Sequence, residues 1–137
     1  MTLINSFTPI EANDFLEQNS ASILIDVRSK LEYSYIGHPL MAINIVWKDY
    51  PDWEINKNFI GEVDDLARRK TSIHQDRPIL LICRSGARSM DAALKLEEAG
   101  YRSLFNVDEG FEGDKDEHNH RSQVNGWKFH GLPWRQG

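Results

Sequence analysis

The sequence predicts a single α/β domain built on a parallel sheet and spanning residues 1–137. Short, wholly apolar runs such as Ile79 to Ile82 lack polar alternation, which is typical of strands buried on both faces of a parallel sheet. Segments of helical periodicity alternate with these runs, as they do where parallel strands are joined by right-handed crossovers. The chain is also long enough to bury a proper hydrophobic core.

The N-terminal part of the chain predicts two strands and a helix between them. Ile4 to Phe7 is predicted to form a short edge strand. Thr8 suits a helix N-cap and Pro9 suits the first turn, so a helix is expected to run to about Gln18. The β-branched, apolar run from Ile23 to Val27 predicts the second strand.

A turn, a strand and a loop are predicted next. Ser29 is followed three residues later by Glu32, which is the spacing of a capping box and predicts a short helical turn. Gly37-His38-Pro39 breaks this turn, and Ala42 to Val46 is the third predicted strand. Residues 47–57 are rich in aromatic side chains and predict an ordered loop.

The second half of the chain continues the alternation of helix and strand. Asn58 to Lys70 has helical periodicity with a polar opposite face, and Pro78 to Ile82 leads into the fourth strand. The helix from Ser89 to Ala99 is expected to end at Gly100. Four of its side chains are predicted to face the core: Met90, Ala93, Leu94 and Leu96. Ser103 to Val107 predicts a last strand.

Residues 108–137 differ in composition from the rest of the chain, with many glycines and charged residues and several aromatic residues. The stretch is too short to form a second domain. Its aromatic residues predict an irregular C-terminal segment that packs back onto the sheet instead of a disordered tail.

The strongest functional signal is the loop Cys83-Arg84-Ser85-Gly86-Ala87-Arg88-Ser89, where the fourth strand ends and a helix begins. Unpaired backbone N–H groups and the helix dipole converge there on any anion, and two arginines add positive charge. These features favour the thiolate form of Cys83, which is the nucleophilic form. The rest of the loop, Arg84, Ser85, Gly86, Ala87, Arg88 and Ser89, is predicted to bind the substrate anion. The alternative, a small buried hydrophobe at Cys83, leaves the polar, open turn after it unexplained.

Two further polar residues occupy the end of a neighbouring strand. Ligands of parallel α/β sheets bind beyond the carboxyl ends of the strands, which is where the Cys83 loop lies. Asp26 and Arg28 follow the second strand at the same edge. They are predicted to support the site structurally, and a direct chemical role is the alternative.

Composition restricts the classes of partner and the location. The net charge of −5 gives no support for binding to nucleic acid or to a membrane surface. No stretch approaches membrane-spanning length, and the N-terminus lacks a basic patch followed by an apolar run, so a cytoplasmic location is expected. Because the chain has one cysteine, any sulfur or oxidation chemistry at Cys83 has to be resolved by a partner molecule.

No metal and no cofactor is predicted. The only metal-like cluster comprises Asp114, Asp116, Glu117, His118 and His120, and its flanking residues indicate a solvated, charged loop. A thiolate surrounded by hydrogen-bond donors suits the capture of an anion with a transferable atom. Two chemistries fit: sulfur transfer through a cysteine persulfide, and phosphate ester hydrolysis through a cysteinyl phosphate.

Three blocks of sequence, in this order, resemble the rhodanese family over roughly residues 7 to 134. Asp26-Val27-Arg28, Glu32-Tyr33, Gly37-His38 and Ala42 to Ile45 together are similar to the family's first motif block. The segment from Cys83 to Ser89 is similar to its active-site loop in the single-domain form. Gly131-Leu132-Pro133-Trp134 resembles its C-terminal signature.

The resemblance implies a five-stranded parallel sheet flanked by helices on both faces and a persulfide carried on Cys83. It also implies a small anionic sulfur donor such as thiosulfate, with cyanide, a thiol or a protein as sulfur acceptor. The chain departs from the commonest pattern in having three residues between Tyr33 and Gly37, in placing Pro39 directly after His38, and in a longer, more charged segment from Gly110 to Gly126. These departures look like those of a subgroup and bear on the natural acceptor.

Counting residues separates the two chemistries. Cysteine phosphatases place the anion-binding arginine six positions after the cysteine, which here is Ser89, whereas Arg88 stands at position five. A loop one residue shorter makes a tighter cradle that suits a terminal sulfur, so the count favours sulfur transfer. A non-enzymatic, partner-binding module would be expected to lack the reactive cysteine or an intact loop. A persulfide relay to a dedicated protein acceptor, docked by the 47–57 loop or the C-terminal segment, stays open.

Overall fold

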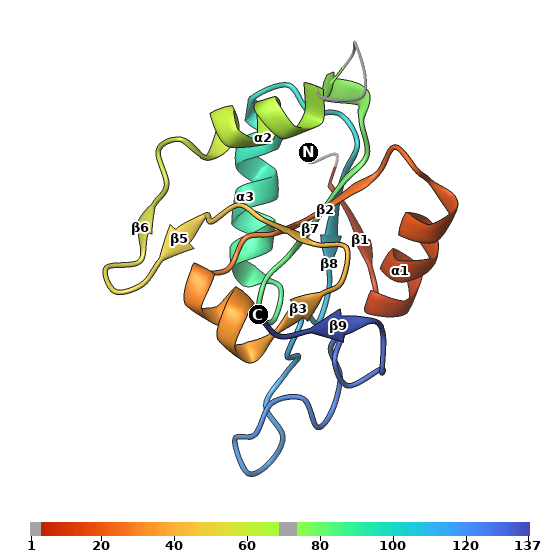
Figure 1. The fold of residues 1–137 in the computed structure, drawn as a ribbon, viewed down its shortest axis with the longest axis vertical. Coiled ribbons are helices and arrows are strands. Elements are labelled where there is room, and N and C mark those ends of the chain that lie inside the picture. Colours follow the sequence, from red (N-terminus) through yellow and green to blue (C-terminus); the bar gives the residue numbers. More distant parts are fainter. Residues whose placement is uncertain (1–3, 69–73) are drawn as a thin grey trace.

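The computed structural model describes residues 4–68 and 74–137, and its centre is a parallel sheet of five strands (Figure 1). The strands lie in the order β1 (Asn5–Phe7), β8 (Leu104–Val107), β7 (Ile79–Ile82), β2 (Ile23–Asp26) and β4 (Ile43–Asn44). Every neighbouring pair is parallel. The predicted α/β fold is therefore confirmed, with the strand that leads into Cys83 at the centre of the sheet.

The side chains of the central strands divide between two hydrophobic cores, one on each face of the sheet. All four residues of β7 are buried, as are all four of β2. Ile79 and Leu81 point into one core and Leu80 and Ile82 into the other, because successive side chains of a strand alternate in direction. Burial on both faces explains why these strands are continuous apolar runs in the sequence.

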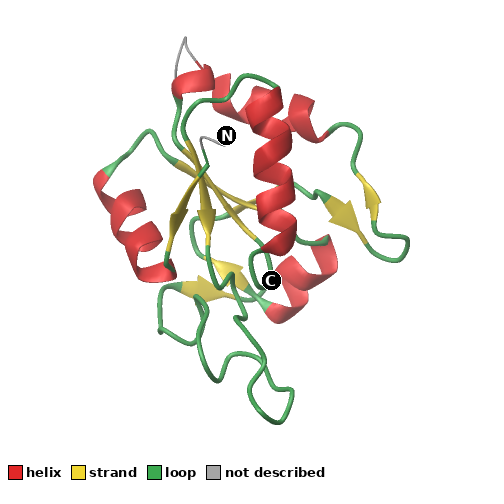
Figure 2. Cartoon of the chain, turned by 180° about the vertical axis from the view of Figure 1, so that it is seen from behind, coloured by secondary structure: helices red, strands yellow, loops and turns green. Residues whose placement is uncertain are grey.

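Helices cover the two faces unequally. Figures 1 and 2 show α2 (Phe59–Ala67) and α3 (Ala87–Glu98) on one face of the sheet and α1 (Pro9–Gln18) on the other. At the start of α1 the predicted Thr8 cap is present, and a capping box with Glu11 completes it: the Thr8 N–H donates to Glu11 Oε1 at 2.9 Å. The predicted end of the second helix at Lys70 lies outside the described residues, and α2 itself ends at Ala67.

Two of the four side chains of α3 that were predicted to face the core, Ala93 and Leu96, are buried, and Met90 is half-buried. The buried residues of α3 are Ser89, Ala92, Ala93 and Leu96, which recur at helical spacing, and Ala99 is the C-cap before Gly100. The prediction that Leu94 faces the core is wrong, since Leu94 is 40% exposed. One residue beyond Ala93 is a turn of about 100° on a helix, and this rotation takes Leu94 off the buried face.

Short elements surround the sheet, several of them unpredicted. The turn predicted at Ser29 is η1 (Glu32–Ile36), a π-helical turn, and His74–Asp76 form the 3₁₀ turn η3. Two small antiparallel pairs were not predicted: β3 (His38–Pro39) with β9 (Trp134–Arg135), and β5 (Lys48–Asp49) with β6 (Glu54–Ile55). The third sheet strand is shorter than the predicted Ala42 to Val46, covering only Ile43–Asn44. None of the described helices is long and apolar enough to cross a membrane.

The C-terminal segment, residues 108–137, lies across the carboxyl edge of the sheet below α1 and η1 in Figure 1. Its Phe111 and Trp127 are fully buried in the core on the α1 side, and the Trp127 indole N–H donates to the Pro133 carbonyl at 2.9 Å. The backbone N–H groups of Phe111 and Glu112 donate to the carbonyls of Cys83 and Arg84, at 2.8 and 3.0 Å. The segment therefore fixes the backbone at the start of the cysteine loop.

Candidate active site

Cys83 follows the last residue of β7 and lies at the carboxyl edge of the sheet, where its side chain is almost completely enclosed. Cys83 is 1% exposed. The Gly86 N–H donates to its Sγ at 3.1 Å, and the Ser89 hydroxyl lies 3.2 Å from the same atom. Two polar hydrogens from the loop and from the first turn of α3 therefore surround the sulfur.

Gly86 is the N-cap of α3 and allows the loop to turn tightly around the sulfur. Its φ of +113° lies in a region that residues with a Cβ rarely adopt. No side chain caps α3, so the N–H groups of its first turn receive no side-chain acceptor. An anion placed beside Cys83 therefore meets unfilled backbone donors and the positive end of the helix dipole.

Asn106 on β8 holds the loop from the neighbouring strand. Its Nδ2 donates to the Gly86 carbonyl at 3.2 Å, and its Oδ1 lies 2.5 Å from Ser89 Oγ. The Ser89 hydroxyl also lies 3.1 Å from the Gly86 carbonyl, so its single proton has three acceptors: the Cys83 sulfur, the Asn106 amide and this carbonyl. A hydroxyl rotates about its C–O bond, so this proton is available to each of the three acceptors. Sequence analysis missed Asn106, whose only signal is its place near the carboxyl end of a strand.

Arg88 is held by an ion pair with Glu32 of η1. Its Nη1 and Nη2 donate to the two carboxylate oxygens at 2.8 and 2.9 Å, and its guanidinium lies 5.3 Å from the centre of the Trp53 ring. Glu32 also accepts from the Ser29 hydroxyl and backbone N–H, which forms the predicted capping box. Both terminal nitrogens of Arg88 thus donate to Glu32, and the ion pair connects the start of α3 to η1.

The Glu32–Arg88 pair has a defined dependence on pH. Burial alone would raise the pKa of Glu32, but the Arg88 guanidinium overrides this effect and holds that pKa below its ordinary value of 4.5. The pKa of Glu32 is lower in the folded chain than in the unfolded chain. The stability that the pair contributes is therefore present above about pH 4.5 and is lost as the pH falls through the folded value.

Replacing Glu32 by glutamine is expected to lower the free energy of unfolding at pH 7 by about 1–3 kcal/mol, the range for hydrogen bonds to charged groups and unsatisfied partners. The difference between wild type and Glu32→Gln should shrink at an acid pH below the folded pKa of Glu32, because Glu32 is then protonated in both states. Urea unfolding at the two pH values measures this, with Glu54→Gln on the exposed strand β6 as the control. A loss of the same size at both pH values would contradict an ionic contribution.

Asp26 and Arg28 form an ion pair that is completely buried beneath the site. Arg28 Nη2 donates to Asp26 Oδ2 at 2.7 Å and to the Gly37 carbonyl at 2.6 Å. The Arg28 guanidinium also lies 4.6 Å from the centre of the Phe111 ring. Neither charged side chain reaches solvent, and together they connect the end of β2 with the turn at Gly37 and with the segment that holds Cys83.

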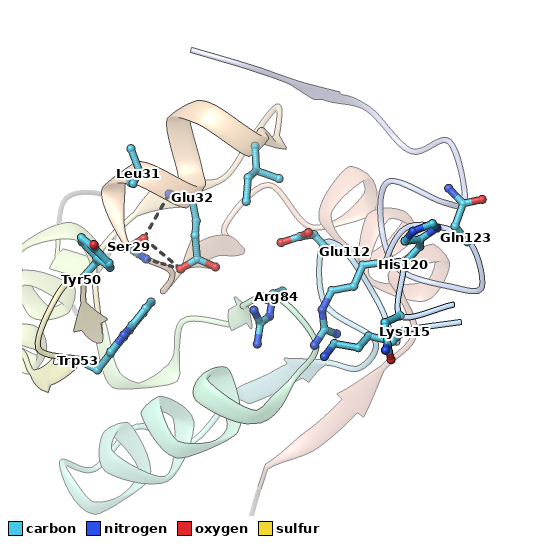
Figure 3. Close-up of a pocket in the computed structure, with 13 residues that line it drawn as sticks. Ser29, Leu31, Glu32, Tyr50, Trp53, Arg84, Glu112, Lys115, His120 and Gln123 are labelled. Atoms are coloured by element: carbon cyan, nitrogen blue, oxygen red, sulfur yellow. Dashed lines mark hydrogen bonds between the residues drawn. The ribbon is translucent and has the colours of Figure 1, made fainter. Parts of the chain in front are cut away.

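A pocket of about 710 Å³ opens at the mouth of the cysteine loop. Arg84 is exposed and lines it. Figure 3 shows Tyr50 and Trp53 on one side of Arg84, and Lys115 with His120 on the other. The pocket thus collects side chains from the η1 region, the β5–β6 hairpin, the cysteine loop and the C-terminal segment.

The remaining predicted residues are placed as follows. Ser85 lies in the loop between Cys83 and Gly86, and Ala87 is the first residue of α3. In the acidic and histidine-rich stretch, Asp116 Oδ1 accepts the backbone N–H groups of His118 and His120 and closes a turn. These bonds, that of His120 most of all, hold the pKa of Asp116 below its ordinary value. Within residues 4–68 and 74–137 no group of three or more potential metal ligands comes together.

The chain is similar in sequence to a family model and to several known proteins. A family model described as the rhodanese-like domain matches residues 8–117. The uncharacterized protein RC0915 of Rickettsia conorii is 33% identical over 132 residues, covering 96% of this chain and 98% of its own. The crystal structure of Rv0390 from M. tuberculosis is 35% identical with a TM-score of 0.83, covering 97% of this chain and 98% of its own. Thiosulfate sulfurtransferase GlpE of Haemophilus influenzae is 27% identical over 106 residues, or 77% of this chain and 83% of GlpE.

Proposed function

The chain belongs to the rhodanese family, and from this premise we propose that it is a sulfurtransferase that carries a sulfane sulfur on Cys83. The observation that carries the proposal is the enclosed Cys83 sulfur, with the Gly86 N–H and the Ser89 hydroxyl beside it and the uncapped start of α3 behind it. This arrangement stabilises negative charge on one sulfur and then on a second sulfur bonded to it. A cytoplasmic location is part of the proposal, since thiol acceptors are kept reduced there.

The proposed donor is thiosulfate or a similar anion. The Cys83 thiolate attacks the terminal sulfur of thiosulfate, the bond between the two sulfur atoms of thiosulfate breaks, and sulfite leaves with the bonding electron pair. Cys83 then carries a persulfide. The small exposure of Cys83 supports a donor of this size, because only a slim reagent reaches the sulfur. An acceptor (cyanide, a thiol or a protein) next attacks the outer sulfur, and the Cys83 thiolate leaves.

Phosphate ester hydrolysis is less well supported by the same loop. An arginine that binds a phosphate group turns two parallel N–H groups toward it, and in Arg88 the two terminal nitrogens donate to the carboxylate of Glu32 instead. Position six after the cysteine is Ser89, whose hydroxyl is engaged within the loop. We assign to Arg88 the positioning of the loop through Glu32, and to Arg84 the reception of the donor.

Mass spectrometry of the intact protein tests the proposal. After incubation with thiosulfate the chain should gain the mass of one sulfur atom and release one equivalent of sulfite. Incubation with an aryl phosphate should leave the mass unchanged and release no phenol. A stable phosphorylated species, or phenol release without sulfur uptake, would favour the phosphatase and overturn the sulfurtransferase.

Replacing Arg84 by lysine is expected to raise KM for thiosulfate by about tenfold while kcat changes little, because a planar guanidinium pairs two oxygens of the donor and an ammonium does not. Arg84 is suited to this role because it is exposed at the mouth of the loop. Steady-state kinetics with cyanide as acceptor measures the effect. Arg102→Lys, at a surface residue paired with Asp76, is the matched control. A lower kcat with an unchanged KM would place Arg84 in the transfer step instead.

A further inference from the structure

The pocket at the mouth of the loop carries positive charge, although the chain as a whole has a net charge of −5. The side chains of Arg84 and Lys115 line it without an ion pair or hydrogen bond to another residue of the described ranges 4–68 and 74–137. Arg121 lines it too and uses one nitrogen on the Gly113 carbonyl, at 2.6 Å. Arg88 neutralises Glu32, and the other carboxylate of the lining, Glu112, has no ion pair with any residue that the structure describes. Three cations therefore face one free carboxylate.

The wall opposite these cations is apolar and exposed. Leu31 and Tyr50 are each 62% exposed and Trp53 is 43% exposed. Figure 3 shows all three on the side of Glu32, away from Lys115 and His120. Apolar side chains that face water gain free energy when a ligand covers them. The pocket thus offers an apolar surface and an anion-binding surface at its two ends.

The pocket has more room than the donor fills beside Arg84. About 710 Å³ lies within the range of about 300–1,000 Å³ typical of sites for drug-sized ligands, and thiosulfate and cyanide are far smaller. The cationic wall also extends beyond the matched family model, which ends at residue 117, before His120 and Arg121. A site of this shape belongs to the larger of the two reactants.

We propose, on the basis of the sulfur transfer proposed above, that this pocket binds the sulfur acceptor and that the acceptor is an organic thiol with an apolar body and an anionic group. The anionic group pairs with Lys115 and Arg121, and the apolar body lies on Leu31 and Trp53. The thiolate of the acceptor attacks the outer sulfur of the Cys83 persulfide. A new sulfur–sulfur bond forms, the bond to the Cys83 sulfur breaks, and Cys83 leaves as the thiolate, so no oxidant or reductant is needed.

Binding is measured first and without any sulfur transfer. The probes are 4-(methylsulfanylmethyl)benzoate, which cannot react with the persulfide, and its methyl ester, titrated into the protein by calorimetry. The carboxylate is expected to bind about tenfold more tightly than the ester, since a hydrogen-bonded charge pair contributes that much. High salt should remove this preference, and Lys115→Gln should weaken it while Arg121 still faces the carboxylate. Lys57→Gln, which makes the same charge change outside the pocket, should retain it.

The transfer step is measured on protein loaded with sulfur from thiosulfate. Discharge of the persulfide by 4-(mercaptomethyl)benzoate should be about tenfold faster at low concentration than discharge by its methyl ester, the same factor as in binding. The two thiols have the same reacting group, so the ratio reports on the remote charge. Leu31→Ser should slow discharge by both compounds, and Leu40→Ser, at another exposed leucine, should not.

The outcomes separate this inference from the function on which it rests. Equal binding of acid and ester, or a preference that is unchanged in Lys115→Gln, overturns the acceptor site whether or not Cys83 takes up sulfur. Selective binding together with equal rates of discharge shows an anion site that does not serve the acceptor, which also overturns it. Failure of sulfur uptake from thiosulfate is seen before any thiol is added and counts against the proposed function.

Discussion

Cys83→Ser is expected to take up no sulfur from thiosulfate and to release no sulfite. The hydroxyl of serine is a far weaker nucleophile at neutral pH than a thiolate and forms no persulfide. Because the chain has no other cysteine, no second thiol takes over the reaction. Turnover with thiosulfate and cyanide should fall to the uncatalysed background. Intact mass and the colorimetric assay of thiocyanate measure the two quantities.

The exchange of sulfur for oxygen removes little volume from the site, so a folded variant is expected. Circular dichroism and urea unfolding of Cys83→Ser serve as controls for the fold. Ser20→Ala, at an exposed serine after α1 and outside the cysteine loop, should still accept one sulfur atom. Sulfur uptake by Cys83→Ser equal to that of wild type would refute the role of Cys83 outright.

Asp26→Asn is expected to destabilise the chain by about 3–5 kcal/mol, the range for breaking a buried ion pair by removing one partner. Both side chains of the pair are completely buried, so Arg28 would keep its charge without a counter-charge and without water. The effect should spread to the site. Arg28 donates to the Gly37 carbonyl and packs on Phe111, whose N–H donates to the Cys83 carbonyl.

Urea unfolding measures the loss, and Asp14→Asn on the exposed side of α1 is the matched control. The double variant Asp26→Asn/Arg28→Met removes the stranded charge and should be more stable than Asp26→Asn alone. A loss below about 1 kcal/mol for Asp26→Asn, the level of an exposed ion pair, would contradict the importance assigned to the pair.

The sequence predicts the sheet and its helices well because burial on two faces leaves a local pattern. Ile79–Ile82 and Ile23–Asp26 are recognisable as strands from their apolar runs alone. The pairs β3–β9 and β5–β6 carry no such pattern, because each strand has two residues. The partners Pro39 and Trp134 are also far apart in the chain, and no periodicity links them.

The candidate site shows the same division between local and distant information. The Cys83 loop and the Ser29–Glu32 capping box are local motifs and were predicted from spacing. The ion pair of Glu32 with Arg88 joins residues 56 positions apart, and the contact of Phe111 with the Cys83 carbonyl forms only when the sheet edge is covered. Side chains of these kinds were visible in the sequence, but their partners were not.

Within the C-terminal segment, residues 113–114 lie against residues 125–126, and we call this close contact the neck. The chain between them forms a loop that begins and ends at the neck. Gly113, with φ of +75°, sits directly against Asn125, the Asp114 N–H donates to Asn125 Oδ1 at 2.7 Å, and the Gly126 N–H donates to Glu109 Oε1 at 2.9 Å. The contacts that hold Cys83 are made before the neck, whereas Lys115 and Arg121 lie beyond it. Lengthening a surface loop whose ends are already held together costs little conformational entropy. Residues of this pocket wall can therefore be inserted or replaced, by evolution or by design, without changing the contacts that hold Cys83.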